Sequence, residues 1–322
     1  MTLAIDAYGA DLRKEGDELV VLADGVERTF ELPLIERLIL TSGASLSHDL
    51  LMSLLARGIP TSFLSRDGEY VGRLEGPGKG GIARARAQFK ARAPHEVLAI
   101  ANEFVAAKVA NQARLIRSAQ SHHRIPHHVA LPEHRTPPED LEHLMGMEGM
   151  AARTYWAALK HAIAPDWNFP GRTGRGANDP VNACLNYLYA VLLSEVVESC
   201  HRAGLHPDAG FLHADRPGRP SLALDLMEPL RPWLADRILV RMIAQGRLDR
   251  KGFEQGERGL RIAEPNREAL IGELLRELKK DAPPNGLQNG SWSQVLHAQT
   301  ESLATALLDP QQSFKAVRVK RR

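Results

Sequence analysis

The sequence predicts an α+β protein, in which a small β-rich domain at the N-terminus is followed by a larger all-helical domain. Short apolar or alternating runs, separated by Gly, Asp and charged turns, fill the first 75 residues. After the glycine-rich break "EGPGKGG", long segments have the spacing of amphipathic helices. A length of 322 residues also favours two domains. We therefore expect a β-rich domain over residues 1–75, a linker over 76–81 and a helical domain over 82–322.

The expected strands of the first domain are "TLAID", "ELVVLA", "VERTFELP", "IERLILT", "PTSFLS" and "EYVGRLE". Between them, "SLSHDLLMSLLARG" predicts one helix, with Ser45 or Ser47 as its cap and Gly58 at its end. The pair Asp67-Gly68 predicts a hairpin between the last two strands.

In the second domain, "PHEVLAIANEFVAAKVANQARLIRSAQ" predicts a long amphipathic helix. One stripe of this helix carries Phe104, Lys108, Asn111 and Leu115. The next helix is expected to begin with Thr136 as its cap, followed by Pro137 and by Glu139 as the partner in a capping box. Asp179 and Pro180 mark the start of a long apolar helix.

The polar connector between the first two of these helices, residues 121–134, is rich in histidine. No spacing among the histidines matches a known ligand pattern, so the connector is interpreted as a solvated loop. Neither its composition nor the basic end "KAVRVKRR" indicates a specific role.

Composition excludes several classes of protein. The formal net charge of +2 does not by itself indicate nucleic acid, and aromatic residues at 5% make a base-stacking surface an unlikely main feature. The two cysteines, Cys184 and Cys200, form no CxxC pair, which excludes a zinc ribbon and disfavours a disulfide framework. We find no signal peptide and no uninterrupted apolar run of the roughly 20 residues that a bilayer requires, so we expect a cytoplasmic protein without a membrane partner.

Glu148 is the first candidate for a functional site. It stands between Gly146 and Gly149 inside a predicted helix, where each glycine costs roughly 1 kcal/mol relative to alanine. Glycines there permit either close packing against another helix or the approach of a bulky ligand to the carboxylate. This segment alone does not decide between the two.

The second candidate is the stretch "FLHADRPGRPSLALDLMEP", which contains His213, Asp225 and Glu228. Asp225 and Glu228 are three residues apart and share a face if they lie on one helix. Pro229 and Pro232 are tolerated only in a first turn, so we expect that helix to begin near Asp225. The two acids then either stabilise a helix start through its dipole or contribute to a metal site.

Taken together, two carboxylates and one imidazole are a suitable ligand set for Mg²⁺ or Mn²⁺. Arginines flank these acids in the sequence and could contact phosphates. They are Arg172, Arg175, Arg216 and Arg219. A metal held by carboxylates and surrounded by arginines suits phosphodiester chemistry.

Over nearly its whole length the chain resembles the CRISPR-associated integrase family Cas-one. "MEGMAARTYW" is similar to the family segment that carries the first metal ligand, and "NDPVNACLNYLYAVL" is similar to its next conserved helix. "FLHADRPGRPSLALDLMEPLRPWLAD" is similar to the family signature that carries the remaining ligands. "AAKVANQARLIR" and the segment from "ILTSGASLSHDLL" to "GEYVGRL" resemble the first catalytic-domain helix and the N-terminal β domain.

The resemblance implies a divalent-metal-dependent DNA endonuclease and integrase of CRISPR spacer acquisition. Glu148, His213 and Glu228 would be the metal ligands, and Asp225 an additional acid of the site. The family further implies a homodimer that acts on double-stranded DNA with the small partner Cas-two, joining 3′-hydroxyl ends of short fragments to the CRISPR repeat.

Three alternatives stay open at this point. The chain could be a stand-alone structure-selective nuclease, or a non-catalytic DNA-binding scaffold. It could also be a transposon-encoded relative of the same fold, although no appended DNA-binding module is expected after the helical domain.

Overall fold

The computed structural model describes residues 1–41, 43–65, 69–74, 76, 81–90, 92–122, 124–134, 136–174, 176–256 and 259–320. The chain forms two compact units, each built from three segments. Unit 1 contains Met1–Lys79, Arg175–Ser194 and Leu248–Leu275, and unit 2 contains Gly80–Gly174, Glu195–Arg247 and Arg276–Arg322. These divisions differ from the continuous domains expected over residues 1–75 and 82–322, whose boundaries stay a prediction.

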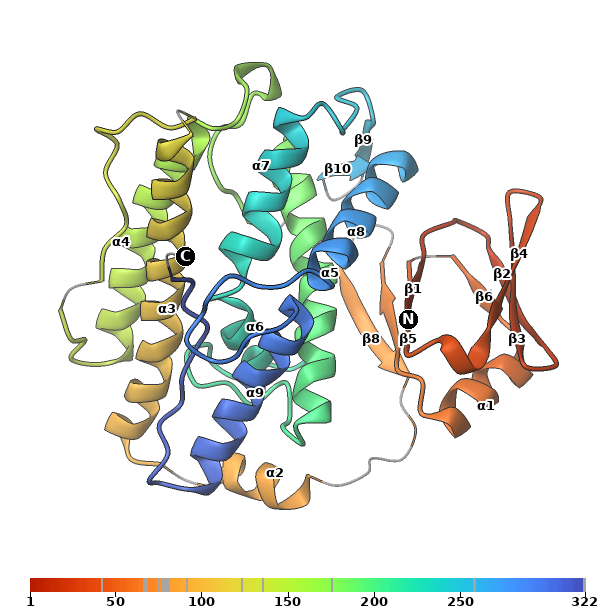
Figure 1. The fold of residues 1–322 in the computed structure, drawn as a ribbon, viewed down its shortest axis with the longest axis horizontal. Helices are drawn as coiled ribbons and strands as arrows, with labels where there is room; N and C mark the ends of the chain where they lie inside the picture. The colour runs from red at the N-terminus through yellow and green to blue at the C-terminus, as the bar shows by residue number, and fades with distance from the viewer. Residues whose placement is uncertain are drawn as a thin grey trace. The chain divides into compact units, whose positions relative to one another are not determined.

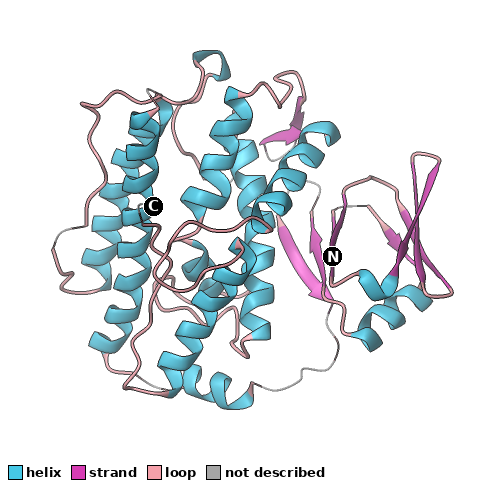
Figure 2. Cartoon of the chain, viewed as in Figure 1, coloured by secondary structure: helices cyan, strands magenta, loops and turns pink. Residues whose placement is uncertain are grey.

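The predicted fold class is confirmed, because a strand-rich N-terminal region precedes a larger and mainly helical part (Figures 1 and 2). One sheet has the order β1-β5-β7-β8, in which β1, β5 and β7 are parallel and β8 is antiparallel. Its strands are Thr2–Ile5, Arg37–Leu40, Thr61–Leu64 and Tyr70–Leu74. The other has the order β4-β3-β2-β6, with strands Val26–Glu31, Glu18–Ala23, Asp11–Glu15 and Ser45–Leu46.

Helix α1 (His48–Arg57) begins and ends as the sequence predicts. The Ser47 hydroxyl accepts a hydrogen bond from the backbone N–H of Leu50, and Gly58 closes the helix in the left-handed conformation, with φ +63°. Leucines of β2, β3, β5 and α1 share one core, which includes Leu12, Leu19, Leu38, Leu50 and Leu54. The antiparallel β7–β8 hairpin is also confirmed, but the turn residues Asp67 and Gly68 lie outside the described residues.

The helical part contains a short β-hairpin, which corrects the prediction that it is all-helical. Strands β9 (Phe253–Gly256) and β10 (Gly259–Ile262) pair antiparallel in unit 1. The first strand, "FEQG", is mostly polar and exposed, so no period-2 apolar pattern marks this hairpin in the sequence. Gly259 has φ +124°, and a Cβ there would lie 2.6 Å from the Ala177 carbonyl oxygen, so the close approach to the backbone requires glycine.

Unit 2 consists of helices and their connections. Its longer helices are α3 (Pro94–Ser121), α4 (Leu141–Lys160) and α9 (Trp292–Leu308). The shorter segments are α2 (Ile82–Phe89), η2 (Pro165–Trp167), α6 (Ser221–Met227), the π-helical segment η3 (Pro232–Asp236) and α7 (Arg237–Ala244). Helix α3 packs against α4, α6 and η3 (Figure 1). It therefore connects the elements that carry the candidate residues Glu148, Asp225 and Glu228.

The predicted start of α4 is wrong. The helix begins at Leu141, and its cap is Asp140, whose carboxylate accepts the backbone N–H of His143 at 2.8 Å. The two consecutive prolines, Pro137 and Pro138, explain the difference, because a residue that precedes proline is disfavoured in the helical conformation.

Helix α5 (Pro180–Arg202) begins where Asp179 and Pro180 predict, and the backbone N–H of Asn182 donates to Asp179 at 2.9 Å. Within the described residues it is the one helix long and apolar enough to cross a membrane. However, 72% of its apolar window is buried inside the protein, which is typical of a core helix. α5 and α8 (Glu264–Leu278) each contribute residues to both units.

Candidate functional site

Two carboxylates from different helices of unit 2 meet at one ammonium group. Glu148 lies on α4, Glu228 follows the last residue of α6, and Lys108 lies on α3. Lys108 Nζ is 2.5 Å from Glu148 Oε1 and 2.6 Å from Glu228 Oε2. The structure therefore brings two of the predicted metal ligands close enough to share one cation.

Lys108 reaches this place because it belongs to the buried stripe of α3. Phe104 and Asn111 are 0% exposed, Leu115 is 5% exposed and Lys108 itself is 9% exposed. The Asn111 side chain donates to the carbonyl oxygen of Pro229 at 2.7 Å, which attaches α3 to the chain just after Glu228. The sequence predicted Lys108 on this stripe and indicated no role for it. A lysine in an otherwise uncharged buried stripe was the signal that could have identified it.

Glu228 is 4% exposed and stands at the C-terminal end of α6. Burial alone would raise the pKa of its carboxyl group, and the helix dipole disfavours an anion at that end. The charges of Arg231, Lys108 and His213 outweigh the burial and lower the pKa of Glu228 to about 2. Arg231 Nη1 lies 2.8 Å from Glu228 Oε1, so each carboxylate oxygen faces a different cation.

The two carboxylates in turn change the pKa of Lys108. Burial would lower the pKa of Lys108, but the neighbouring charges of Glu228 and Glu148 raise it overall. The ammonium group of Lys108 is therefore charged at neutral pH. At 2.6 Å its contact with Glu228 Oε2 is an ion pair, but that oxygen has no hydrogen bond of good geometry.

Asp225 is fully buried and holds His213 in place. Its carboxylate accepts the backbone N–H groups of Phe211 at 2.7 Å, Leu212 at 2.9 Å and His213 at 3.0 Å. His213 Nδ1 lies 2.6 Å from Asp225 Oδ1. With Nδ1 as the donor, Nε2 of the neutral ring is left as an acceptor, which is the form that binds metals.

The alternative of a helix start stabilised by two acids is wrong. Helix α6 begins at Ser221 rather than near Asp225, and it has no acidic residue in its first turn. The chain turns at Glu228 and Pro229, and Pro232 begins the π-helical segment, so neither proline interrupts a regular α-helix.

The glycines beside Glu148 do not serve close helix packing. A Cβ added at Gly146 or Gly149 would meet no atom within 4 Å. Met145 and Met150, which flank the two glycines, are 54% and 60% exposed. The approach of a bulky ligand, the other interpretation, stays a prediction.

The structure describes three of the four arginines that were predicted to bind phosphate. Arg216 is exposed and Arg219 half-buried in the loop that joins His213 to α6, where the backbone N–H of Arg219 donates to the carbonyl oxygen of Arg216. Arg172 lies in the loop after η2 and is half-buried. Arg175 lies outside the described residues.

The donor types suit a hard divalent metal, although the described residues include no group of three or more His, Cys, Asp or Glu side chains arranged to hold one. Glu148 and Glu228 already share a cation, the ammonium of Lys108, and Glu228 Oε2 lacks a well-aligned hydrogen bond. Carboxylate oxygens with one imidazole nitrogen are ligands that Mg²⁺ and Mn²⁺ accept. The donor types of Glu148, Glu228 and His213 therefore suit the metal that the resemblance implies, and their role as its ligands stays a prediction.

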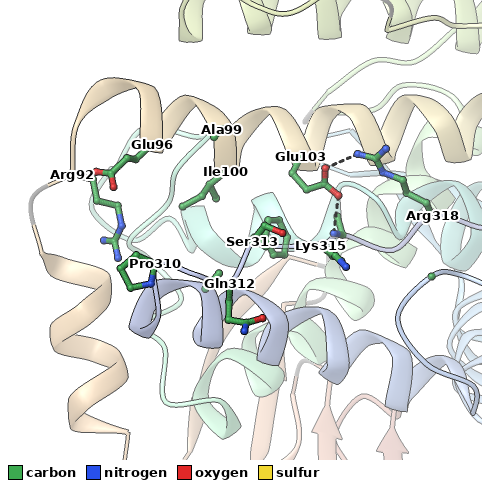
Figure 3. A pocket seen from close by; sticks show the side chains of 14 residues that line it. Arg92, Glu96, Ala99, Ile100, Glu103, Pro310, Gln312, Ser313, Lys315 and Arg318 are labelled. Atoms are coloured by element: carbon green, nitrogen blue, oxygen red, sulfur yellow. Dashed lines mark hydrogen bonds and ion pairs between the residues drawn. The ribbon is translucent and has the colours of Figure 1, made fainter.

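A separate pocket of about 690 Å³ lies between the first half of α3 and the segment after α9 (Figure 3). Three of its charged side chains have partners. Glu103 accepts the backbone N–H of Ala316 at 3.1 Å and pairs with Arg318 at 2.5 Å. Arg92, at the other end, donates to the Leu307 carbonyl oxygen at 3.3 Å. None of the three predicted metal ligands lines this pocket.

The connector between α3 and α4 is mostly exposed where it is described. Its last histidine is an exception, because His134 Nε2 lies 2.8 Å from Asn102 Oδ1 on α3, and burial lowers the pKa of its ring. This contact ties the end of the connector to the helix that carries Lys108.

Comparison with known proteins gives consistent matches over most of the chain. CRISPR-associated endonuclease Cas1 2 of Rhodospirillum rubrum is 35% identical over 301 residues, which are 87% of this chain and 86% of that protein. A casposase bound to integration product has a TM-score of 0.86 at 22% identity, with 98% of this chain and 92% of that chain covered. A Cas6-RT-Cas1–Cas2 complex has a TM-score of 0.82 at 22% identity and covers all of this chain and 36% of that one.

The casposase and the Cas6-RT-Cas1–Cas2 complex support the fold alone, whereas the sequence matches identify the family. The sequence profile of CRISPR associated protein Cas1 matches residues 3–276. That range includes Lys108 and every described residue of the site, and the chain therefore belongs to the Cas1 family.

Proposed function

We propose that the protein is a divalent-metal-dependent DNA integrase and endonuclease of CRISPR spacer acquisition. The observation that carries the proposal is the convergence of Glu148 and Glu228 on one cation, on helices that the family profile matches. The relative from Rhodospirillum rubrum is named an endonuclease. In the proposed reaction, the 3′-hydroxyl of a short DNA fragment attacks a phosphodiester of the repeat, and the 3′-oxygen of the broken bond leaves.

Glu148, His213 and Glu228 would hold Mg²⁺ or Mn²⁺. When bound, the metal supplies charge stabilisation to the phosphoryl oxygens. Asp225 keeps His213 in the orientation and tautomer that a ligand needs. Its carboxylate already accepts four contacts from residues 211–213, so we assign it a positioning role. Arg231 keeps Glu228 ionised although the side chain is buried.

The substrate and partners of this proposal are double-stranded DNA, a second copy of the chain and the small protein Cas2. Arg172, Arg175, Arg216 and Arg219 are proposed to contact phosphates, so binding should show little sequence preference and fall steeply with salt. A homodimer is proposed to form through the N-terminal β-rich part. Cas2 is proposed as the partner because a solved complex of similar fold contains Cas1 with Cas2. We expect the assembly in the cytoplasm.

The test is a strand-transfer assay with short duplexes, a repeat-bearing plasmid and Mn²⁺, with and without Cas2. Glu148→Ala, His213→Ala and Glu228→Ala should abolish strand transfer and Mn²⁺ binding. Asp225→Ala should lose about 10–100-fold and keep some metal affinity, as is usual for residues that orient a ligand. The matched control is Glu142→Ala, which removes an exposed glutamate of the same helix as Glu148.

Full activity of the Glu148, His213 and Glu228 variants would place the reaction elsewhere in the molecule. Metal loss in Asp225→Ala with metal retained in Glu228→Ala would reverse the roles of those two acids. Cleavage of branched DNA without strand transfer would favour a structure-selective nuclease. DNA binding without either reaction would favour a non-catalytic scaffold.

A further inference from the structure

The proposed reaction assigns no role to Lys108, although this lysine lies in the acidic site. Its ammonium group contacts both Glu148 and Glu228, and only 11% of its side chain is exposed. Two carboxylates close to one point repel each other unless a positive charge lies between them. Arg231 faces the other oxygen of Glu228, at 2.8 Å. Lys108 contacts both carboxylates, and its charge therefore stabilises the pair in this structure.

The lysine can leave this place without any movement of the backbone that carries the carboxylates. It is attached to α3, whereas Glu148 belongs to α4 and Glu228 follows α6. Its ammonium group ends a flexible four-carbon chain. Helix α3 is held independently of Lys108, because Asn111 donates to the carbonyl oxygens of Pro229 at 2.7 Å and Val317 at 2.9 Å.

An ammonium group and a divalent ion need the same oxygens here. A protonated lysine has three N–H donors and no lone pair, so it can bind carboxylates but cannot be a metal ligand. Mg²⁺ and Mn²⁺ also bind carboxylate oxygens. The two kinds of cation therefore compete for Glu148 Oε1 and Glu228 Oε2, because two positive charges at the same oxygens repel each other.

We infer that Lys108 is a positioning residue that occupies the cation place between Glu148 and Glu228 when no metal is bound, and that it competes with the metal for them. This inference rests on the metal dependence proposed above. In the metal-free protein, Lys108 holds Glu148 of α4 and Glu228 after α6 close together. When a divalent ion binds, Lys108 loses its contact with at least one of these carboxylates. It therefore weakens metal binding while it stabilises the empty site.

The experiment compares the full-length wild-type protein with Lys108→Met, which keeps the chain length and removes the charge. Mn²⁺ affinity is measured from the electron paramagnetic resonance signal of free Mn²⁺, and Tm is measured with chelator and with saturating Mn²⁺. We expect a lower Tm in chelator, a larger rise in Tm with Mn²⁺ and a Kd for Mn²⁺ lower by about tenfold, the scale on which residues beside a metal change its affinity. None of these readouts depends on enzymatic activity.

Two further variants control for folding and for the loss of a lysine in general. Lys108→Gln keeps a hydrogen-bond donor without a charge, and it should show the same tighter Mn²⁺ binding even if Lys108→Met folds poorly. Lys280→Met removes another lysine of unit 2 that pairs with a glutamate, since Lys280 Nζ lies 2.9 Å from Glu277 Oε2. Its Mn²⁺ affinity should equal that of the wild type.

The outcomes separate this inference from the proposed function. If the wild type binds Mn²⁺ and both Lys108 variants bind it equally or more weakly, the competition is absent and the proposed metal dependence is unaffected. If only the Lys108 variants bind Mn²⁺, the competition is supported in its strongest form. If none of the proteins binds Mn²⁺, or if Glu228→Gln binds it as tightly as the wild type, the metal site and the inference both fail.

Discussion

A buried glutamate at the C-terminal end of a helix is an unfavourable arrangement that its neighbours have to correct. Glu228 is in this position after α6, and burial and the helix dipole both act against its charge. Lys108 and Arg231 reverse the balance, because each lies within 2.8 Å of one of its oxygens. The site thus holds a carboxylate that is ionised at neutral pH although it is buried.

The stability of the metal-free protein should depend on pH through this residue. The pKa of Glu228 is lowered from its ordinary value of 4.5 to about 2, so its stabilising contribution is complete above pH 4.5 and is lost as the pH falls towards 2. The pKa of Lys108 is raised, so its contribution is complete below its ordinary value of 10.5 and is lost only at higher pH. Between pH 5 and pH 2 the wild type should lose on the order of 3 kcal/mol more than Glu228→Gln.

The measurement is the free energy of unfolding in urea, determined at steps of pH with chelator present. The other acidic groups of the chain titrate in both proteins, so the difference between the two curves isolates Glu228. Parallel curves would show that Glu228 is not held ionised by its neighbours.

Among the elements, α4 combines a buried face with an open one. Tyr155, fully buried, donates to Asp236 of η3 at 2.6 Å, one face of α4 packs against α3, and Glu148 points to Lys108. The π-helical turn begins at Pro232, which has no N–H for a regular helical bond, and such turns often lie at functional sites. The Tyr155–Asp236 contact thus links the helix of Glu148 to the segment that follows Glu228.

The open face of α4 allows a test of ligand approach. Gly149→Ala adds a Cβ that meets no atom within 4 Å, so it should stabilise the protein by about 1 kcal/mol through helix propensity. If DNA approaches Glu148 over this face, the same variant should bind a DNA duplex more weakly at each salt concentration. Unfolding in urea and a binding titration across a salt series measure the two effects.

Gly272→Ala is the matched control, because Gly272 is also a helical glycine, in α8, with no atom within 4 Å of an added Cβ. It should give a similar gain in stability without any change in DNA binding. Unchanged DNA binding by Gly149→Ala would mean that the glycines have no part in ligand approach.

At the scale of the whole molecule, unit 1 depends on a buried charge cluster that joins distant parts of the chain. Arg267 Nε of α8 lies 3.0 Å from Oδ2 of Asp6, 261 residues earlier in the sequence and just after β1. Thr41 donates a hydrogen bond to the same carboxylate. Burial raises the pKa of Asp6 despite these partners, and burial together with the Asp6 charge raises the pKa of Tyr187 on α5.

Removing the arginine should therefore destabilise unit 1 strongly. Arg267→Met leaves Asp6 buried without its counter-charge, and such a loss costs about 3–5 kcal/mol. The loss should be smaller at pH 4 than at pH 7, because the pKa of Asp6 is already raised and a protonated carboxyl needs no counter-charge. Urea unfolding of the full chain at the two pH values measures this.

Two variants test the cause of that loss. Adding Asp6→Asn to Arg267→Met should restore part of the stability, since the two groups are coupled. Arg57→Met breaks an ion pair with Asp17 in which the two side chains are 34% and 73% exposed, so it should cost no more than about 1 kcal/mol. If Asp6→Asn restores nothing, the loss has another origin than the unpaired carboxylate.

Features that depend on a few neighbouring residues could be predicted without the structure. Alternation and turn residues predicted the main strands, Ser47 and Gly58 bounded α1, and the family motifs identified Glu148, His213 and Glu228 as candidates. The strands β2, β6, β9 and β10 were missed. β2 ("DLRKE") and β9 ("FEQG") are mostly polar, β6 has only two residues, and β10 ("GLRI") has only two apolar ones. The starts of α4 and α6 were wrong where prolines allowed more than one local arrangement.

The tertiary structure decided everything that depends on packing between distant segments. Lys108 contacts both Glu148, 40 residues later, and Glu228, because α3 packs against both α4 and α6. No local sequence pattern contains that information. The hydrogen-bond partners of Asp225, which lie in the loop before its own helix, could not be predicted either. Nor could the assembly of unit 1 from three separate segments of the chain. Local conformational preferences act over one or two helical turns, whereas the balance between a buried charge and its counter-charge is set only when the helices meet.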